Sequence, residues 1–307
     1  MGSKAIWDNY YYKVKAIYSS SAANSADSEV VSSTSNLSSP VVTVTNVESS
    51  GKIKVNWDAV DGAAKYEVYR ATSKSGTYKK LITTTKTSVT NTSTEAGKTY
   101  YYKVRAIHTD GVTSSNDSSV VSRTCDLARP TVTVSNVESS GKIKVSWNAI
   151  EGAVKYEIYR ADSKDGTYSR IYSGTNTSVT NTKNLEAGKT YYYKVRAIHG
   201  TSAANSAYSE VKSRMCDLAR PVVTLSVTSA GKPKVSWDKV EGAAKYEIYR
   251  ATSKSGTYTC IYSGTSTSVT NTKNVTKGKT YYYKVKAIHT NSSANSSYSS
   301  VKSIAAK

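Results

Sequence analysis

The stretch that most constrains the fold of this chain is residues 191–198, which read Tyr-Tyr-Tyr-Lys-Val-Arg-Ala-Ile. Close copies begin at Tyr10, Tyr100 and Tyr281. Side chains alternate between the two faces of a β-strand, so one face of this stretch is apolar apart from phenol hydroxyls and the other carries its two cations. The pattern predicts a half-buried strand of an antiparallel sheet with one face on the core.

The repeat divides the chain into units. Trp57, Trp147 and Trp237 recur every 90 residues, in step with the tyrosine blocks. A unit of this length can close its own core as a small sandwich, unlike the short repeats of a solenoid. We therefore predict a partial domain at 1–37, which holds only the last two strands of a unit, and complete domains at 38–127, 128–218 and 219–307.

Each complete unit reads as a series of short alternating segments with turn residues between them. Leu and Glu are scarce, and no apolar 3.6-residue period lasts for the length of a helix. The sequence predicts an all-β fold, a tandem array of seven-stranded Ig-like Greek-key sandwiches. In the second unit the expected strands are 131–137, 142–147, 155–160, 168–172, 177–182, the organising stretch 191–198 and a last strand near 208–213.

The composition limits the core and the partners. The chain has 26 Tyr and no Phe, so Trp, Tyr, Val and Ile must fill the core. The net charge of +20 attracts polyanions, and an anionic cell-wall polymer, a glycan or another surface protein would suit as a partner. We expect no specific nucleic-acid partner. The alternative is a solvated, Lys-rich surface without a site.

Three cysteines are too few and too irregular for a disulfide framework or a zinc site. Cys125 and Cys216 share one repeat position, and Cys260 has no counterpart. We expect free thiols. The alternative is a Cys216–Cys260 bridge, which would need Cα atoms within about 7 Å.

Three sequence motifs of the complete repeats point to one particular kind of β-sandwich domain. A lone Trp in the second strand, Tyr-x-Ile-Tyr in the third, and Leu-x-x-Gly-x-x-Tyr-x-Tyr-x-Val-x-Ala entering the sixth together resemble a fibronectin type III domain. The resemblance implies a seven-stranded sandwich of two sheets. It also implies that Tyr100, Tyr191 and Tyr281 are tyrosine-corner residues, whose hydroxyl bonds to the backbone upstream.

The phrasing Gly-Ala-x-Lys-Tyr-Glu-Ile-Tyr-Arg-Ala is similar to modules in surface and secreted proteins of Gram-positive anaerobic bacteria. There, tandem copies act mostly as spacers or adhesive segments, so the resemblance implies an extracellular or cell-surface location. The usual Pro before the corner Gly is replaced by Ala96, Ala187 and Lys277. The chain has no Arg-Gly-Asp, so the integrin binding of some animal relatives is not carried over.

We expect no catalysis, cofactor or metal. His108, His199 and His289 occupy one repeat position, and sites a domain apart cannot share a metal, so we expect surface histidines. The sequence has no Gly-x-Ser-x-Gly, His-Glu-x-x-His or phosphate-binding Gly loop. It also has no apolar run long enough for a transmembrane helix, and residues 1–7 lack the apolar stretch of a signal peptide.

The candidate binding surface is the outer face of the third and sixth strands, where tyrosines flanked by cations could stack on sugars or bind acidic polymers. The alternative is internal stabilisation, in which Tyr–Tyr and Glu–Lys pairs lie opposite one another at about 0.2–1 kcal/mol each. The candidate residues are Tyr69, Tyr101, Lys103 and Arg105 in the first unit, Tyr159, Tyr192, Lys194 and Arg196 in the second, and Tyr249, Tyr282, Lys284 and Lys286 in the third, with Glu67, Lys155, Glu157 and Glu247 on the same face.

The loops and linkers complete the interpretation. Loops 200–205 and 290–295 are small and polar and are expected to be flexible filler. Linkers 125–130 and 216–221 end in Pro and lack a Gly-Ser run, which predicts a semi-rigid rod. The partial domain needs cover for its apolar face, from the next domain or from a second copy by self-association.

These features favour a non-catalytic spacer and interaction segment of a larger extracellular bacterial protein. The alternative is an adhesin or a carbohydrate- or cell-wall-binding array, in which three similar faces act by avidity.

Overall fold

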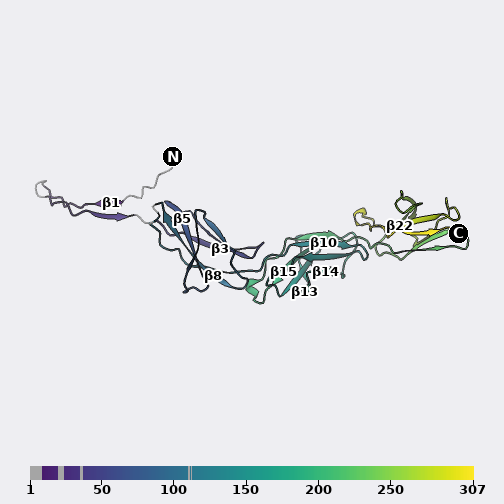
Figure 1. Cartoon of the computed structure of the whole chain (residues 1–307), viewed down its shortest axis with the longest axis horizontal. Helices are drawn as coiled ribbons and strands as arrows, with labels where there is room; N and C mark the ends of the chain where they lie inside the picture. The colour runs from purple at the N-terminus through teal and green to yellow at the C-terminus, as the bar shows by residue number, and fades with distance from the viewer. Residues whose placement is uncertain (1–8, 20–23, 35–36, 110, 112) are drawn as a thin grey trace. The chain divides into compact units, whose positions relative to one another are not determined.

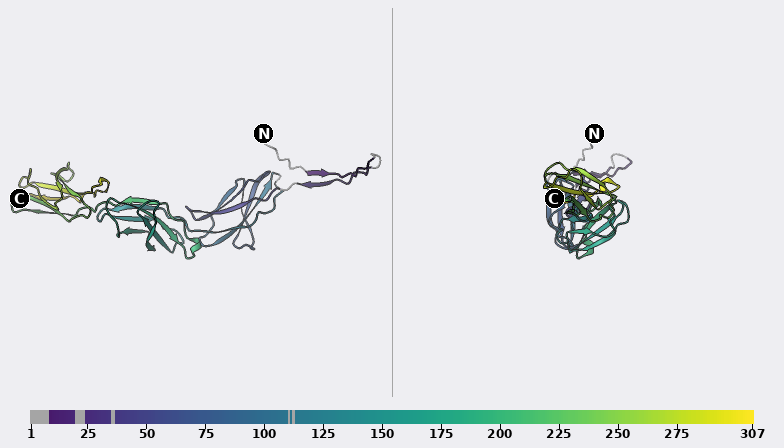
Figure 2. Two further views of the ribbon diagram at one scale, coloured as in Figure 1. Left: turned by 180° about the vertical axis from the view of Figure 1, so that it is seen from behind. Right: turned by 90° about the vertical axis from the view of Figure 1, so that its right-hand side faces the viewer.

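A computed structural model describes residues 9–19, 24–34, 37–109, 111 and 113–307, and antiparallel strands dominate it (Figures 1 and 2). The helices in this part of the chain are two single-turn 3-10 segments, η2 (Ser202–Ala204) and η3 (Ser292–Ala294). Neither approaches the length or apolarity that a membrane-spanning helix needs. The predicted all-β fold is confirmed.

Each complete repeat contains a three-stranded sheet whose middle strand carries the repeat's tryptophan. The alternation of the middle strand decides its orientation, because its apolar residues are buried and the lysines between them are not. In order of pairing, the sheets are β3 (Val42–Val47), β4 (Lys52–Trp57) and β7 (Ser88–Asn91); β10 (Val132–Val137), β11 (Lys142–Trp147) and β14 (Ser178–Asn181); and β17 (Val223–Val227), β18 (Pro233–Trp237) and β21 (Ser268–Thr270).

Facing it is a four-stranded sheet in which the organising strand is the third member. The third and sixth strands of each repeat are neighbours, as predicted, and the order is that of a Greek-key sandwich. In order of pairing, the sheets are β6 (Lys79–Thr84), β5 (Ala63–Ala71), β8 (Thr99–His108) and β9 (Val121–Thr124); β13 (Ser169–Gly174), β12 (Lys155–Ala161), β15 (Thr190–Ile198) and β16 (Lys212–Met215); and β20 (Thr259–Gly264), β19 (Lys245–Ala251), β22 (Thr280–Ile288) and β23 (Lys302–Ala305).

The last strand begins later than expected. The prediction near 208–213 is wrong at its start, because β16 covers Lys212–Met215. The physical cause is a serine whose hydroxyl replaces a ladder partner. Val195 N–H donates to Ser209 Oγ at 3.0 Å, and Ser209 N–H returns a bond to the Val195 carbonyl at 2.8 Å. The segment therefore stays bound to β15 without regular strand geometry.

The partial unit is a hairpin of β1 (Asn9–Tyr12) and β2 (Val31–Thr34), which form a sheet of their own (Figure 1). The strand expected from Tyr10 to Ile17 is shorter than predicted, because β1 ends at Tyr12. Residues 1–8, 20–23 and 35–36 of the predicted partial domain lie outside the described residues.

The core of each repeat forms between its two sheets. Trp57, Trp147 and Trp237 are 5–6% exposed, which confirms them as core residues. The third tyrosine of each organising strand (Tyr102, Tyr193 or Tyr283) is fully buried, and in the second repeat Asn181 Nδ2 donates to the Tyr193 hydroxyl at 3.1 Å. Burial raises the pKa of Tyr193 to about 12. A buried hydroxyl needs such a partner, which explains how tyrosine fills a core that contains no Phe.

The implied tyrosine corners are present in all three repeats. The Tyr191 hydroxyl accepts a hydrogen bond from Glu186 N–H at 2.9 Å. The first repeat has the same bond at 3.1 Å and the third at 2.9 Å. The first repeat has the longest of the three bonds, and its corner is intact.

All three cysteines are free, as predicted, and the alternative Cys216–Cys260 bridge is wrong. Cys125 and Cys216 are buried, and each thiol donates to a turn carbonyl at 2.9 Å, that of Gly51 or Gly141. Cys260 is exposed.

By their contacts the residues form two compact units. The first holds the chain to Ala128 together with His199–Ser206, and the second holds Arg129–Ile198 and Ala207–Lys307. The loop after β15 thus belongs to the first unit although its flanking strands belong to the second. The domain boundaries at 37, 127 and 218 stay predictions.

Candidate functional site

The candidate face lies on the side of the four-stranded sheet that points away from the core. In the second repeat, Glu157 lies opposite Arg196 and Tyr159 lies opposite Lys194. The pairs here and in the first repeat are Glu–Arg and Tyr–Lys, whereas in the third repeat Glu247 lies opposite Lys286. The expected Tyr–Tyr pairs are wrong, and the expected Glu–Lys pair is present in the third repeat. Each unit's remaining candidate tyrosine lies opposite an alanine, in the pairs Tyr101–Ala71, Tyr192–Ala161 and Tyr282–Ala251.

Glu157 is the centre of this face. Its side chain lies on the outer face, as alternation predicts, yet it is only 6% exposed because neighbouring side chains cover it. Tyr159 Oη and Arg196 Nη2 donate to its Oε2, both at 2.9 Å, and Arg170 Nη1 donates to its Oε1 at 2.7 Å. A buried carboxylate requires this degree of compensation. Arg170 was not among the predicted site residues, and it reaches Glu157 from the neighbouring strand β13.

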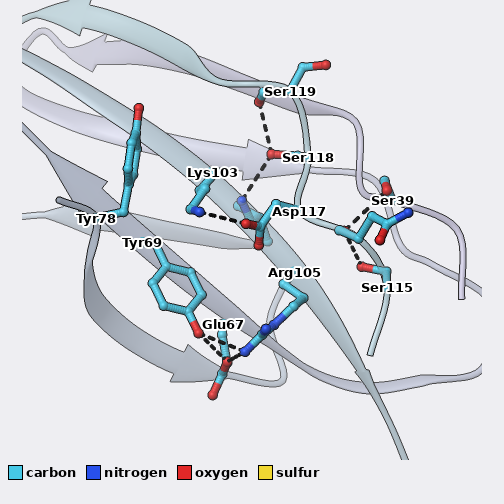
Figure 3. A network of polar contacts seen from close by, with 12 residues as sticks. Ser39, Glu67, Tyr69, Tyr78, Lys103, Arg105, Ser115, Asp117, Ser118 and Ser119 are labelled. Atoms are coloured by element: carbon cyan, nitrogen blue, oxygen red, sulfur yellow. Dashed lines mark hydrogen bonds and ion pairs between the residues drawn. The ribbon is translucent and has the colours of Figure 1, made fainter. Parts of the chain in front are cut away.

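The first repeat has the same arrangement (Figure 3). Tyr69 Oη and Arg105 Nη2 donate to Glu67 Oε2 at 2.6 Å and 2.7 Å, and Lys80 Nζ donates to Oε1 at 3.0 Å. Hydrogen bonds from Tyr69 and Arg105 outweigh burial and lower the pKa of Glu67 to about 2. In the second repeat burial acts to raise the pKa of Glu157, but its three donors bring it below the ordinary value.

A lysine on the organising strand is held between tyrosine rings. Lys194 Nζ lies 4.3 Å from the ring centroids of both Tyr168 and Tyr208, and Tyr208 packs edge-on against Tyr159 at 5.3 Å. Such cation–π contacts are worth about 0.5–1 kcal/mol at exposed sites and more when desolvated. Lys284 has the same surroundings, at 4.5 Å and 4.0 Å from Tyr258 and Tyr298.

In the first repeat an aspartate replaces one ring of this cage. Lys103 Nζ forms an ion pair with Asp117 Oδ2 at 2.6 Å and lies 4.9 Å from the Tyr78 ring centroid (Figure 3). The lysine of the face is thus partnered in all three repeats, either by two rings or by a carboxylate and a ring. This makes the lysine unavailable to a ligand unless those contacts break.

The third repeat lacks the arginine pair of the second. Cys260 lies opposite Tyr249 at the position of Arg170, and Lys286 stands at that of Arg196. Glu247 still accepts from the Tyr249 hydroxyl at 2.8 Å, and its ion pair is with Lys245 at 3.8 Å. A thiol cannot supply the positive charge that Arg170 gives to Glu157.

Replacing Cys260 with arginine should therefore stabilise the third repeat. We expect a gain of about 0.5–1 kcal/mol, since the new guanidinium would be as exposed as Arg170 and screened accordingly. The measurement is amide hydrogen exchange of β19–β22, with Cys260→Ser as the matched control for loss of the thiol. The gain should shrink in high salt; an equal effect of both substitutions would contradict the proposed ion pair.

Tyr101, Tyr192 and Tyr282 differ from the other candidates. Among the described residues, the Tyr192 side chain makes no hydrogen bond and no ring contact. It is partly exposed and lies on the same face as Tyr159, Lys194 and Arg196, whose side chains already have partners. The structure therefore brings the twelve predicted site residues onto three similar faces, but only this tyrosine position keeps an unused aromatic surface.

The loop after the organising strand contacts the preceding repeat, which the sequence interpretation missed. In the first compact unit, Leu127 N–H in the linker donates to the carbonyl of Ala204 in this loop at 2.9 Å, and Ala204 is fully buried. A Cβ added to Gly97 would lie 2.5 Å from His199 Cε1. His199 is thus half-buried against the corner glycine, and loop 199–206 is an ordered contact. The prediction of flexible filler is wrong here, and His199 is only partly exposed at the surface.

The same contact is present in the second compact unit, between the second and third repeats. Leu218 N–H donates to the Ala294 carbonyl at 2.8 Å, and a Cβ on Gly188 would lie 2.5 Å from His289 Cε1. Gly188 has a φ of +82°, which also disfavours any side chain there. The signal that could have found these contacts is the near-identity of loops 200–205 and 290–295, which filler does not require.

Potential metal ligands are not grouped together in the described part of the chain. No group of three or more His, Cys, Asp or Glu side chains there is placed to hold a metal ion.

Comparison with known proteins supports the resemblance seen in the sequence. Residues 42–118 match the family model for a PBP1-like, fibronectin3-like domain. The human fibronectin type III domain-containing protein 7 is 30% identical over 244 residues, which cover 78% of this chain and 32% of that protein. An amylopullulanase of Thermoanaerobacter thermohydrosulfuricus is 36% identical over 83 residues, 26% of this chain and 6% of the enzyme.

Other similarities are weaker. Mouse tenascin-N is 25% identical over 72% of this chain and 14% of its own length. Among solved structures, the chicken CNTN1 FN1–FN3 domains align with a TM-score of 0.29 at 16% identity, covering 88% of this chain and 99% of theirs. The chain spans about a third or less of the curated relatives named here.

With the sandwich topology, the tyrosine corners and the matching family model in place, the class is defined. The chain is an array of fibronectin type III domains. Domains of this family are typically structural and interaction modules.

Proposed function

We propose that this chain is a non-catalytic spacer and interaction segment of a larger extracellular bacterial protein. The observation that carries the proposal is that the side chains of the candidate face bind one another. Glu157 and Glu67 each bind two cations and a tyrosine hydroxyl, and Lys194 lies between two rings. Side chains bound to one another in this way stabilise a sheet and leave little free charge for a ligand.

The contacts between repeats support the spacer role. The loops that follow β15 and β22 bind the linker and the corner glycine of the preceding repeat through hydrogen bonds and a packed histidine. Linkers held in this way are not flexible coils. The match to an 83-residue segment of a bacterial amylopullulanase supports the bacterial and extracellular parts of the proposal.

The second candidate is an array of binding modules for glycans or anionic cell-wall polymers. The observation that favours it is the equivalent position of Tyr101, Tyr192 and Tyr282, of which the Tyr192 side chain makes no hydrogen bond or ring contact among the described residues. A partly exposed aromatic ring beside cations suits both sugar stacking and acidic polymers. Three such rings would act together by avidity.

A pull-down of the chain on insoluble polysaccharides and purified bacterial cell walls, at low and at high salt, separates the two. As a spacer, the chain should be retained only at low salt, because retention would come from its charge of +20, which salt screens. As a binding module, it should be retained at high salt, and Tyr192→Ser together with its equivalents at 101 and 282 should weaken retention about tenfold or more.

Tyr159→Ser is the matched control, because the Tyr159 hydroxyl donates to Glu157 and its ring packs against that of Tyr208. It should lower the stability of the second repeat without changing retention. High-salt retention that depends on Tyr192 would reject the spacer proposal, and retention that falls equally with both substitutions would point to loss of folding instead.

A further inference from the structure

The positive charge of the chain is concentrated in its third complete repeat. Residues 219–307 contain 14 Lys and Arg but only three Asp and Glu, a net charge of +11. Residues 128–218 contain 13 and eight, a net charge of +5. The two repeats thus have nearly the same number of cations, and the difference comes from lost carboxylates. The positions of the lost carboxylates show where the third repeat has cations without partners.

One lost carboxylate lies at the tyrosine corner. In the second repeat Glu186 Oε2 lies 2.7 Å from Lys189 Nζ. Thr276 takes the place of this glutamate in the third repeat, because the N–H of each donates to the hydroxyl of the corner tyrosine. The next residue is Lys277, where the second repeat has an alanine. Lys279, the equivalent of Lys189, therefore has a cation as its charged neighbour in the loop and no carboxylate.

A second carboxylate is lost beside the arginine that binds this loop. In the second repeat Arg160 Nε lies 3.8 Å from Asp162 Oδ1, and the third repeat has Thr252 at the position of that aspartate. The arginine itself is kept, since Arg250 Nη1 donates to the Lys273 carbonyl at 2.8 Å. The loop therefore keeps its contact with the arginine and loses the neighbouring negative charge.

Five cations gather at this loop of the third repeat. Arg250 Nη1 donates to one loop carbonyl at 2.8 Å, and Lys232 Nζ donates to another at 3.5 Å. Three further lysines belong to the loop itself and are exposed. Among the described residues, no carboxylate forms an ion pair with any of the five. We call this set the corner cations: Lys232, Arg250, Lys273, Lys277 and Lys279.

A corner of this kind stays accessible beside a neighbouring repeat. In the second repeat, the side chains of Glu186 and Lys189 are 69% and 61% exposed. They keep this exposure although His289 of the third repeat packs against Gly188, which lies between them. The equivalent positions 276 and 279 can therefore contact a ligand even where a further domain lies next to them.

The corner cations suit a partner that is recognised by charge alone. Lysine ammonium groups are compact point charges that bind phosphate without a fixed fork geometry. The guanidinium of Arg250 is already bound to loop carbonyls and lies 5.2 Å from the centroid of the Tyr281 ring. Tyr281 itself is only 2% exposed. The corner thus offers neither a free arginine fork for a carboxylate nor a ring on which a sugar or a base would stack.

We propose that the corner cations form a binding site for a linear phosphate polymer, in which successive phosphates contact successive lysines. The proposal rests on the interaction role proposed above, and it places that interaction away from Tyr192 and its equivalents. Binding of this kind releases counterions from the polymer, so the affinity falls as the salt concentration rises.

The test measures binding of the full chain to fluorescent inorganic polyphosphate at low salt, by anisotropy. The main variant combines Thr276→Glu and Lys277→Ala, which introduce the residues that the second repeat has at these positions. Its affinity should be about tenfold lower or more, because two units of charge are removed from the site. Amide hydrogen exchange of β22 checks that the variant is folded.

Lys239→Glu is the matched control, because it removes the same two units of charge at an exposed position beyond the other end of β18. It should change the affinity by less than about threefold, since salt screens charges that lie far from the bound polymer. Equal effects of the main variant and the control would overturn the site, because net charge alone would then explain the binding.

Lys273→Ser provides a second variant that does not alter the corner residues 276 and 277. The first repeat has Ser93 at this position, where Arg70 Nη1 donates to the Ser93 carbonyl at 2.9 Å. The substitution should weaken binding about threefold or more, and an unchanged affinity would contradict the site.

Polygalacturonate and duplex DNA, compared at equal charge concentration, test the chemistry of the partner. Polyphosphate should bind most tightly, and tighter binding of either other polymer would overturn the assignment to a phosphate polymer. All these variants keep the tyrosine face, so a failure of this proposal is distinct from the outcome of the cell-wall pull-down with Tyr192→Ser.

Discussion

Replacing Trp147 with alanine should destabilise the second repeat by about 3–5 kcal/mol. Trp147 is 6% exposed, and its ring lies 5.5 Å from that of Tyr156 and 6.5 Å from that of Tyr172. The loss combines the transfer free energy of the indole with the cavity that it leaves. Because single domains are stable by only about 5–15 kcal/mol, this is a large part of the total.

The effect should stay within that repeat, since each repeat has its own tryptophan core. Hydrogen exchange resolved by segment is the suitable measurement, because it reports β10–β16 separately from the other strands. Val154→Ala is the control, at a side chain 55% exposed, and should change the stability by less than about 0.5 kcal/mol. Loss of protection in all three repeats together would contradict independent cores.

Glu157→Gln should destabilise the second repeat by about 2–3 kcal/mol at neutral pH. The amide keeps the shape of the side chain but removes the charge that Arg170 and Arg196 bind at 2.7 Å and 2.9 Å. Arg196 is 28% exposed, so water compensates it only in part. Urea unfolding followed by hydrogen exchange measures the difference, and Glu151→Gln, an exposed carboxylate, is the control.

The same interaction predicts how stability depends on pH. The pKa of Glu157 in the folded chain is lowered, so its contribution is present above the ordinary glutamate pKa and is lost as the pH falls through the folded-state value. In the first repeat, where the pKa of Glu67 is about 2, the loss should extend from near 4.5 down to about 2. A difference in stability between wild type and Glu67→Gln that persists unchanged from neutral pH down to pH 2 would contradict this linkage.

The candidate face could be predicted from the sequence only in part. Alternation placed Tyr159, Lys194 and Arg196 on one face correctly, because the two-residue period of a strand is a local property. It could not give the register between β12 and β15, so it paired Tyr with Tyr and Glu with Lys. It also could not show that Arg170, from β13, would bury Glu157, because that depends on three strands meeting side by side.

The repeat junctions show the same limit. Small polar residues in loop 200–205 satisfy the rules for a flexible loop, yet Ala204 is fully buried there. The reason is a partner distant in sequence, the linker around Leu127, whose N–H donates to the Ala204 carbonyl. The same contact brings His199 against Gly97. No local propensity encodes such a contact.

The sequence by itself determined the all-β architecture, the repeat and the buried tryptophans, because these follow from side-chain alternation and from spacing along the chain. Its resemblance to fibronectin type III domains implied the tyrosine corners. The tertiary structure decided which charges meet and which loops are ordered. Those properties depend on register and on contacts between segments far apart in the chain, which are settled only when the strands pack.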